Sequence, residues 1–259
     1  MIHVFVVVAS MVCLQAASAS DSQREADLAD ALRKTLALGR AISLNANGDA
    51  FLAIHTEAEK TDDHFAAIIL HDLDAHPDQK PLIHELRTSL PLRNIATLSI
   101  MLPLREAGAD DADYLPLFEQ ASARIKAAID HLKQQGGQQI ALIGHGLGAQ
   151  MALFHLSAHP ENVAAFVAIG LPVVDDAPPQ GRTIELIPRV ALPFLDIYAE
   201  FDEASVQNSA RMRRMAGKDN PVFRQIRMAG ENHGHDRDAV LTVKRVYSWL
   251  ATTFDFNKL

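Results

Sequence analysis

The feature that most constrains the fold is a glycine-rich turn between a short apolar run and an apolar helical segment. The predicted strand Gln139–Ile143 leads directly into the pentapeptide Gly144–Gly148 (GHGLG), and residues 147–158 are predicted to be helical. Glycines at such a junction let a strand and the following helix approach without Cβ atoms between them. A strand that feeds directly into a helix is typical of a βα unit in a parallel sheet.

The rest of the chain repeats this alternation. Further strands are predicted at Phe51–His55, Phe65–Leu70, Ile95–Met101, Val163–Ile169, Phe194–Tyr198 and Val222–Met228. Further helices are predicted at about 22–38, 81–90, 114–135, 204–216 and 238–251. The run Phe65–Leu70 (FAAIIL) is apolar throughout, as expected for a strand buried on both faces. We therefore expect one α/β domain over residues 21–259, in three layers, with helices on both faces of a mostly parallel sheet.

The first 20 residues are predicted to be a signal peptide. Ile2–Ala19 contains no Lys, Arg, Asp or Glu and ends in the small residues Ala17-Ser18-Ala19, which suit cleavage after residue 19 or 20. This predicts a periplasmic or secreted protein, and Cys13 lies inside the leader, so the cleaved protein would contain no cysteine. A retained membrane anchor is the alternative, because 18 apolar residues are near the lower limit for a spanning helix.

Charge and composition exclude some partners. The chain has 24 basic and 32 acidic side chains, a formal net charge of −8, and no run of Lys or Arg. It therefore lacks the basic footprint of a nucleic-acid-binding protein, and nothing favours an anionic membrane surface after signal cleavage. The expected partner is a small molecule or a protein of unknown identity, and no cofactor is expected. The 12 histidines are more than a chain of this length usually carries.

Several chemistry-bearing residues follow predicted strands. Asp202 comes just after Phe194–Tyr198, and His233 comes just after Val222–Met228. The pentapeptide resembles the G-x-S-x-G turn that exposes a nucleophile, and the order turn, acid, histidine is that of the α/β hydrolases. Such folds place their ligands at the carboxyl ends of the strands.

A loop that could supply an oxyanion donor follows the strand Phe65–Leu70, at His71-Asp72-Leu73. The segments FLAIH, IILHDLDAHPD, IATLSIMLP, IALIGHGLGA and FLDIYAEFD together carry the resemblance. On these segments the chain resembles the α/β-hydrolase superfamily, and more narrowly a bacterial family of exported, uncharacterised proteins with that fold. The resemblance implies an α/β-hydrolase-like fold and triad-like positions at His145, Asp202 and His233, but no substrate. Residues Leu171–Leu192 are too few for a large cap domain, although a loop of this length can form a lid.

The sequence departs from the hydrolase pattern at the turn, where we assign the nucleophile position to His145 in place of serine. Histidine tolerates the positive φ of such a turn, but its imidazole is too long for an ordinary Ser–His contact with His233. The backbone N–H groups of Gly146 and Leu73 are the expected oxyanion donors. A carboxylate at Asp72 beside them would oppose a developing anion.

Three interpretations follow. The first is a non-hydrolytic protein that binds a ligand or a partner through the hydrolase pocket. The second is an unconventional hydrolase that uses His145, His233 and Asp202, or a metal held by these three with His71. The third treats the histidines as incidental, and Asp202 as the N-terminal cap of the helix at 204–216.

Overall fold

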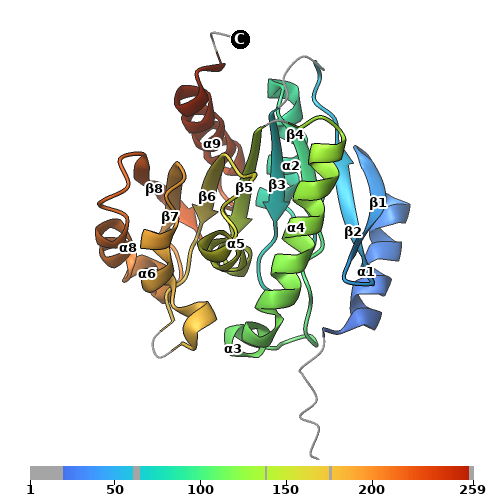
Figure 1. Ribbon diagram of the computed structural model, residues 1–259, viewed down its shortest axis with the longest axis horizontal. Coiled ribbons are helices and arrows are strands. Elements are labelled where there is room, and N and C mark those ends of the chain that lie inside the picture. The colour runs from blue at the N-terminus through green and yellow to red at the C-terminus, as the bar shows by residue number, and fades with distance from the viewer. Residues whose placement is uncertain (1–19, 61–64, 138, 175–176, 257–259) are drawn as a thin grey trace, which may run out of the picture.

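The computed structural model describes residues 20–60, 65–137, 139–174 and 177–256. The predicted signal peptide lies outside the described residues, apart from Ser20. Within the described chain, eight strands form one sheet in the order β1-β2-β4-β3-β5-β6-β7-β8 (Figure 1). The strands are β1 (Arg40–Ala46), β2 (Asp49–Thr56), β3 (Phe65–Leu70), β4 (Ala96–Ile100), β5 (Gln139–His145), β6 (Ala165–Ile169), β7 (Phe194–Phe201) and β8 (Phe223–Asn232).

The sheet is parallel from β4 to β8, whereas β2 pairs in antiparallel fashion with both of its neighbours, β1 and β4. The carboxyl ends of β3, β5, β7 and β8 therefore meet at one edge of the sheet. The strand order reverses beside β3, and this is where open α/β sheets bind ligands.

Helices cover both faces, as the sequence predicts. The helices α4 (Phe118–Gln134) and α5 (Leu147–Ala158) pack on one apolar face, while α2 (Leu82–Ser89) and α9 (Ala239–Phe254) pack on the other. The helix α1 (Ser22–Thr35) lies beside β1 and β2 at one edge (Figure 1). The remaining short helices are α3 (Asp111–Tyr114), α6 (Thr183–Leu186), α7 (Ala204–Gln207) and α8 (Ala210–Ala216). The three-layer α/β fold is thus confirmed.

The structure adds an edge strand that the sequence analysis did not predict. Strand β1 forms a hairpin with β2, and the connecting residues Asn47 and Gly48 both have positive φ, as a tight hairpin turn requires. Most residues of β1 are exposed or half-buried, so its hydrophobic pattern is weak. The predicted helix at 22–38 also ends earlier, at Thr35.

The segment Leu171–Leu192 packs onto the body of the protein wherever the structure describes it. Leu186, Ile187 and Val190 are buried in the core that α4 and α5 share. The side-chain amide of Gln150, on α5, donates to the carbonyl oxygen of Gly181 at 3.1 Å. The segment therefore forms no large cap domain.

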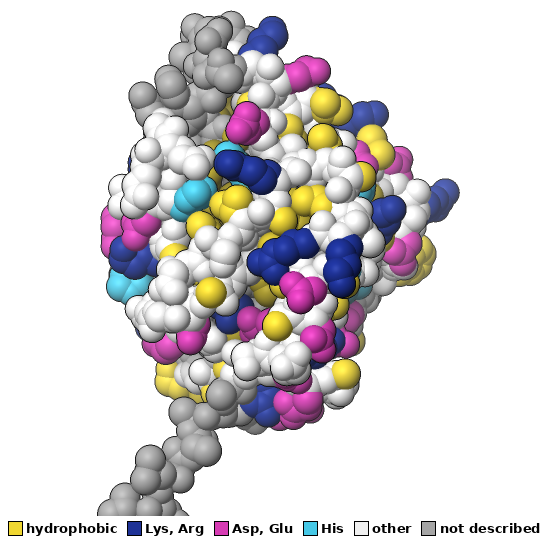
Figure 2. All heavy atoms as spheres, turned by 90° about the vertical axis from the view of Figure 1, so that its right-hand side faces the viewer, with side chains coloured by type: hydrophobic (Ala, Val, Ile, Leu, Met, Phe, Trp, Pro, Cys, Tyr) yellow, Lys and Arg dark blue, Asp and Glu magenta, His cyan; other side chains and the backbone are white. Residues whose placement is uncertain are grey.

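The molecular face over α1 and β1 has a mixed surface. Figure 2 shows Lys and Arg side chains interspersed with Asp and Glu on this face, with hydrophobic side chains scattered between them. Among the described residues, no helix has the length and hydrophobicity to cross a bilayer.

Candidate functional site

The strand-to-helix turn after β5 is formed by Gly146. Strand β5 continues through His145, helix α5 begins at Leu147, and Gly146 between them has φ 50° and ψ −118°. The prediction that His145 takes the positive φ of this turn is therefore wrong. The physical reason is the register: the turn residue of a G-x-S-x-G pentapeptide is its third, and in Gly144–Gly148 the third residue is Gly146.

Glycine is required on both sides of the turn by close approach. A Cβ atom on Gly144 would lie 2.6 Å from the backbone nitrogen of Ala149, and one on Gly148 would lie 2.8 Å from the carbonyl oxygen of Leu70. Both distances are too short for carbon. Helix α5 can therefore begin against β3 and β5 only because these two residues lack side chains.

The carboxylate of Asp72 fills the space above Gly146. Its Oδ1 accepts hydrogen bonds from the backbone N–H groups of Leu73 and Leu147, both at 2.7 Å. In the hydrolase fold, these two positions, one after the turn residue and one after β3, donate to the oxyanion. A Cβ atom on Gly146 would overlap the Asp72 carboxylate. The Asp72 carboxylate can therefore occupy this space only because residue 146 is glycine.

His233 lies between two carboxylates. Its Nδ1 is 2.6 Å from Oδ1 of Asp202, and its Nε2 is 2.8 Å from Oδ2 of Asp72. Because a carboxylate only accepts hydrogen bonds, both ring nitrogens donate and His233 is an imidazolium. Burial opposes this charge, but the two hydrogen bonds raise the pKa of His233 to about 10. Burial alone would raise the pKa of the Asp202 carboxyl, but the hydrogen bond to the charged His233 outweighs it, and the pKa of Asp202 is lowered.

His145 contacts His233 through its ring face and through the backbone. Its Nε2 donates to the carbonyl oxygen of His233 at 2.9 Å, and the two rings stack with centroids 4.7 Å apart. Its Nδ1 faces Oδ2 of Asp72 at 4.0 Å. Burial lowers the pKa of His145, which favours the neutral ring. The structure therefore brings His145, Asp202 and His233 together, but with no hydrogen bond between the two rings.

Two predicted site residues have other partners. The Nε2 of His71 accepts the N–H of Leu102 at 3.0 Å, and its Nδ1 donates to the carbonyl oxygen of Asp72 at 2.8 Å. Because both of its ring nitrogens already have hydrogen-bond partners, His71 is not placed to ligate a metal. The N–H of Gly146 donates to Ile169 at 2.9 Å. The assignment of Gly146 as an oxyanion donor is thus wrong, because sheet pairing already uses that N–H.

Sequence reasoning missed Leu147 and the central place of Asp72. Counting the pentapeptide from Gly144 would have put the turn at Gly146 and the donor at Leu147. Asp202 does not cap a helix, because α7 begins at Ala204 with Glu203 at its N-cap position. Instead, its Oδ2 accepts the N–H of Ala199 at 2.8 Å, which fixes the carboxylate that holds His233.

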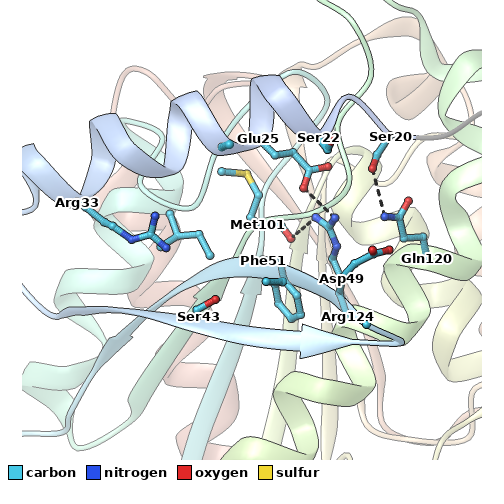
Figure 3. Close-up of a pocket in the computed structure, with 14 residues that line it drawn as sticks. Ser20, Ser22, Glu25, Arg33, Ser43, Asp49, Phe51, Met101, Gln120 and Arg124 are labelled. Carbon is cyan, nitrogen blue, oxygen red and sulfur yellow. Dashed lines mark hydrogen bonds and ion pairs between the residues drawn. The ribbon is translucent and has the colours of Figure 1, made fainter.

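Asp72, His145 and His233 open onto a cavity of about 300 Å³, whose other walls are mainly residues 73–75 and 79–83. A larger cavity of about 620 Å³ lies under α1, and none of these three residues lines it (Figure 3). Its most buried charges, Glu25 and Arg124, pair with each other at 2.8 Å. The smaller cavity is the candidate site, because polar groups converge there at the strand ends.

The fold is that of the α/β hydrolases. Similar solved structures include Est1E from Butyrivibrio proteoclasticus (14% identity, TM-score 0.68, 84% of this chain and 99% of that one). A putative dienelactone hydrolase from Klebsiella pneumoniae subsp. pneumoniae MGH 78578 is also similar (15% identity, TM-score 0.69, covering 83% and 98%). So is XC6422 from Xanthomonas campestris, described as an a/b serine hydrolase without lid (14% identity, TM-score 0.61, covering 83% and 95%).

The chain belongs to the family described as protein of unknown function (DUF3530), which it matches over residues 12–112 and 105–252. No curated protein matches it. At identities of 14–15%, the solved structures establish the fold alone.

Proposed function

We propose that this protein is exported and uses the pocket of the hydrolase fold to bind a ligand or a partner without hydrolysing it. One observation carries the proposal. One oxygen of the Asp72 carboxylate accepts hydrogen bonds from the two backbone N–H groups that would otherwise donate to an oxyanion. The other oxygen accepts a hydrogen bond from Nε2 of His233.

Ester hydrolysis by this fold needs a nucleophile, a base and an oxyanion hole. The turn residue Gly146 has no side chain to attack with. Both nitrogens of His233 donate to carboxylates, so the ring has no lone pair to accept a proton. A negative charge on Asp72 already occupies the position where the oxyanion would develop. All three requirements are unmet at once.

The hydrolytic alternative needs His145 to attack while Asp202 orients it through His233. The hydrogen bond of His145 goes to the backbone carbonyl of His233, at 2.9 Å, so no chain of side-chain hydrogen bonds leads from Asp202 through the His233 ring to His145. The remaining nitrogen of His145 faces a carboxylate oxygen. This geometry favours binding over hydrolysis.

The decisive experiment combines a fluorophosphonate probe with hydrolysis of p-nitrophenyl acetate. The unaltered protein is expected to stay unlabelled and to hydrolyse the ester no faster than free imidazole. Covalent labelling of a serine, or a rate far above imidazole that is lost in His145→Ala, would overturn the proposal.

A matched pair of variants tests the role of Asp72. The double variant Gly146→Ser, Asp72→Gly frees the oxyanion N–H groups and supplies a hydroxyl, so we expect labelling by the probe. Gly146→Ser alone is expected to remain unlabelled, because Asp72 still occupies the space around the new side chain. Equal labelling of both would show that Asp72 does not block the site.

Export rests on the leader, whose small residues Ala17-Ser18-Ala19 suit signal-peptidase cleavage. Expression of the whole chain in a bacterial host, followed by fractionation and N-terminal sequencing, tests it. The expected mature N-terminus is Ser20 or Asp21, in the periplasm or the medium. An intact leader on a membrane-bound protein would instead indicate an anchor.

A further inference from the structure

Three side chains of the site place one donor atom each in the same part of the cavity. These atoms are Oδ2 of Asp72, Nδ1 of His145 and Nε2 of His233, and all lie within 4.8 Å of one another. The same three residues line the cavity of about 300 Å³ at the strand ends. Two imidazoles and one carboxylate are a donor set that suits divalent transition metals, zinc among them.

Each histidine is oriented by its other ring nitrogen. The Nε2–H of His145 is held by the carbonyl of His233 at 2.9 Å, which leaves the lone pair of His145 on Nδ1. The Nδ1–H of His233 is held by Asp202 at 2.6 Å, which directs Nε2 toward Asp72. Histidines that ligate metals usually donate their second N–H to a carbonyl or carboxylate in this way.

The carboxylate of Asp72 is oriented in the same manner. Two backbone N–H groups fix Oδ1 and leave Oδ2 facing the histidines. The Nδ1 of His145 and Oδ2 of Asp72 are both acceptors, and they face each other at 4.0 Å. A cation between them would replace this unfavourable approach by two ligand bonds.

The distances are close to those of a loaded site. Ligand atoms around tetrahedral zinc lie about 3.3 Å apart, given metal–ligand distances of about 2.0–2.2 Å. Oδ2 of Asp72 is 2.8 Å from Nε2 of His233 and 4.0 Å from Nδ1 of His145. To reach this spacing, Oδ2 of Asp72 and Nε2 of His233 would move apart by about 0.5 Å, and Nδ1 of His145 would approach Oδ2 by about 0.7 Å.

We propose that Asp72, His145 and His233 bind one divalent transition-metal ion of the zinc class, with Asp202 as the positioning residue behind His233. The ion would take the place of the proton between His233 and Asp72, which is released to solvent, and the cavity leaves room for a further ligand. This inference rests on the proposed function, since it names the ligand class of a site that binds without hydrolysing.

The test is calorimetric titration of Zn²⁺ into the chelator-treated protein at pH 7.5. We expect one ion per chain, with Mg²⁺ at the same concentration failing to bind because nitrogen donors disfavour it. Asp72→Asn and His145→Ala are expected to weaken binding at least 100-fold. Asp202→Asn is expected to weaken binding 10- to 100-fold, the usual effect of removing an outer partner of a ligand.

His159→Ala is the matched control, because this histidine is exposed and lies outside the cavity at the strand ends. It should bind Zn²⁺ like the unaltered protein. Asp72→Asn retains the side-chain shape, and a far-UV circular dichroism melt confirms that each variant is folded. Absence of Zn²⁺ binding, or binding unchanged in both Asp72→Asn and His145→Ala, would overturn the inference. The proposed function would survive either result, because it fails only if the probe labels a serine of the unaltered protein or if the protein hydrolyses the ester far faster than imidazole through His145.

Discussion

Two of the regions in which the described chain buries charged side chains differ in their balance of charge. The first is the α1 ion pair, formed by Glu25 and Arg124, which lines the large cavity of Figure 3. The second is the Asp72 cluster, formed by Asp72, His145, Asp202 and His233. In the α1 ion pair one anion meets one cation at 2.8 Å, and the other oxygen of Glu25 accepts the N–H of Leu104 at 3.0 Å.

The Asp72 cluster is not balanced in this way. Its two carboxylates share the single cation His233, and the neutral ring of His145 directs an acceptor nitrogen at Asp72. The α1 ion pair thus balances its charges within itself and holds α1 against α4. The Asp72 cluster keeps an excess of acceptors at the edge of a cavity, as expected of a site that takes up a cation. Three of the following four experiments test this difference, and the fourth examines a buried histidine outside both regions for comparison.

The largest expected effect is on stability, from Glu25→Ala. Removing one partner of a buried ion pair leaves the other charge buried and unpaired, which typically costs about 3–5 kcal/mol. Arg124 is only 2% exposed, so its charge would lose its carboxylate partner in a largely buried position. Urea unfolding measures the loss, and Asp27→Ala, an exposed change on the same helix, should cost less than about 0.5 kcal/mol. A cost for Glu25→Ala as small as that of the control would show that the pair does not anchor α1.

The second effect concerns His155, a buried histidine that lies outside both regions. Burial lowers its pKa to about 4, and its Nδ1 pairs with the hydroxyl of Ser122 at 2.8 Å. The folded protein therefore disfavours the protonated ring, and this contribution to stability is complete above pH 6.5 and lost as the pH falls toward 4. The difference between the two pKa values corresponds to about 3 kcal/mol.

Urea unfolding at pH 7.5 and pH 4.5 measures this effect, with His155→Gln as the control that lacks the titrating ring. The unaltered protein should lose more stability than the variant between the two pH values. An equal loss in both would mean that the pKa of His155 is the same in the folded and the unfolded protein.

The third effect is expected from Gly146→Ala. A Cβ atom there is strained by the positive φ and overlaps Asp72, so we expect a loss of about 2 kcal/mol. In the background Asp72→Gly only the strain of the positive φ remains, and the loss should fall to about 1 kcal/mol. A double-mutant cycle measured by urea unfolding gives the coupling between the two positions. Independent, additive losses would contradict the steric coupling on which the account of the Asp72 cluster depends.

Much of the fold could be predicted because parallel strands buried on both faces appear in the sequence as continuous apolar runs. The run Phe65–Leu70 is buried at every position, and helix α5 is apolar on nearly all sides. Strand β1 was missed because its residues are mostly exposed or half-buried, so that its pattern resembles that of a loop. Its pairing with β2 is evident only once the Asn47–Gly48 turn joins them.

The site could be located from the sequence but not assembled. Asp202 and His233 were found because each follows a strand, and topology brings strand ends together. The role of Asp72 could not be found in this way, because it depends on the space that Gly146 leaves and on the direction of two backbone N–H groups. Such a contact joins residues far apart in the chain, and no spacing within one segment encodes it.

The smallest expected effect is from Asp74→Asn, which breaks a link between the two regions. Arg24, on α1, pairs with Asp74, and Asp74 lines the cavity beside the Asp72 cluster. Because the Asp74 side chain is 45% exposed, water screens the pair, and its loss should cost less than about 1 kcal/mol. Urea unfolding measures this cost, and Zn²⁺ titration of the same variant should give an unchanged affinity. A tenfold change in affinity would mean that α1 and the Asp72 cluster act as one unit, because the arrangement of α1 would then reach the metal ligands through Asp74.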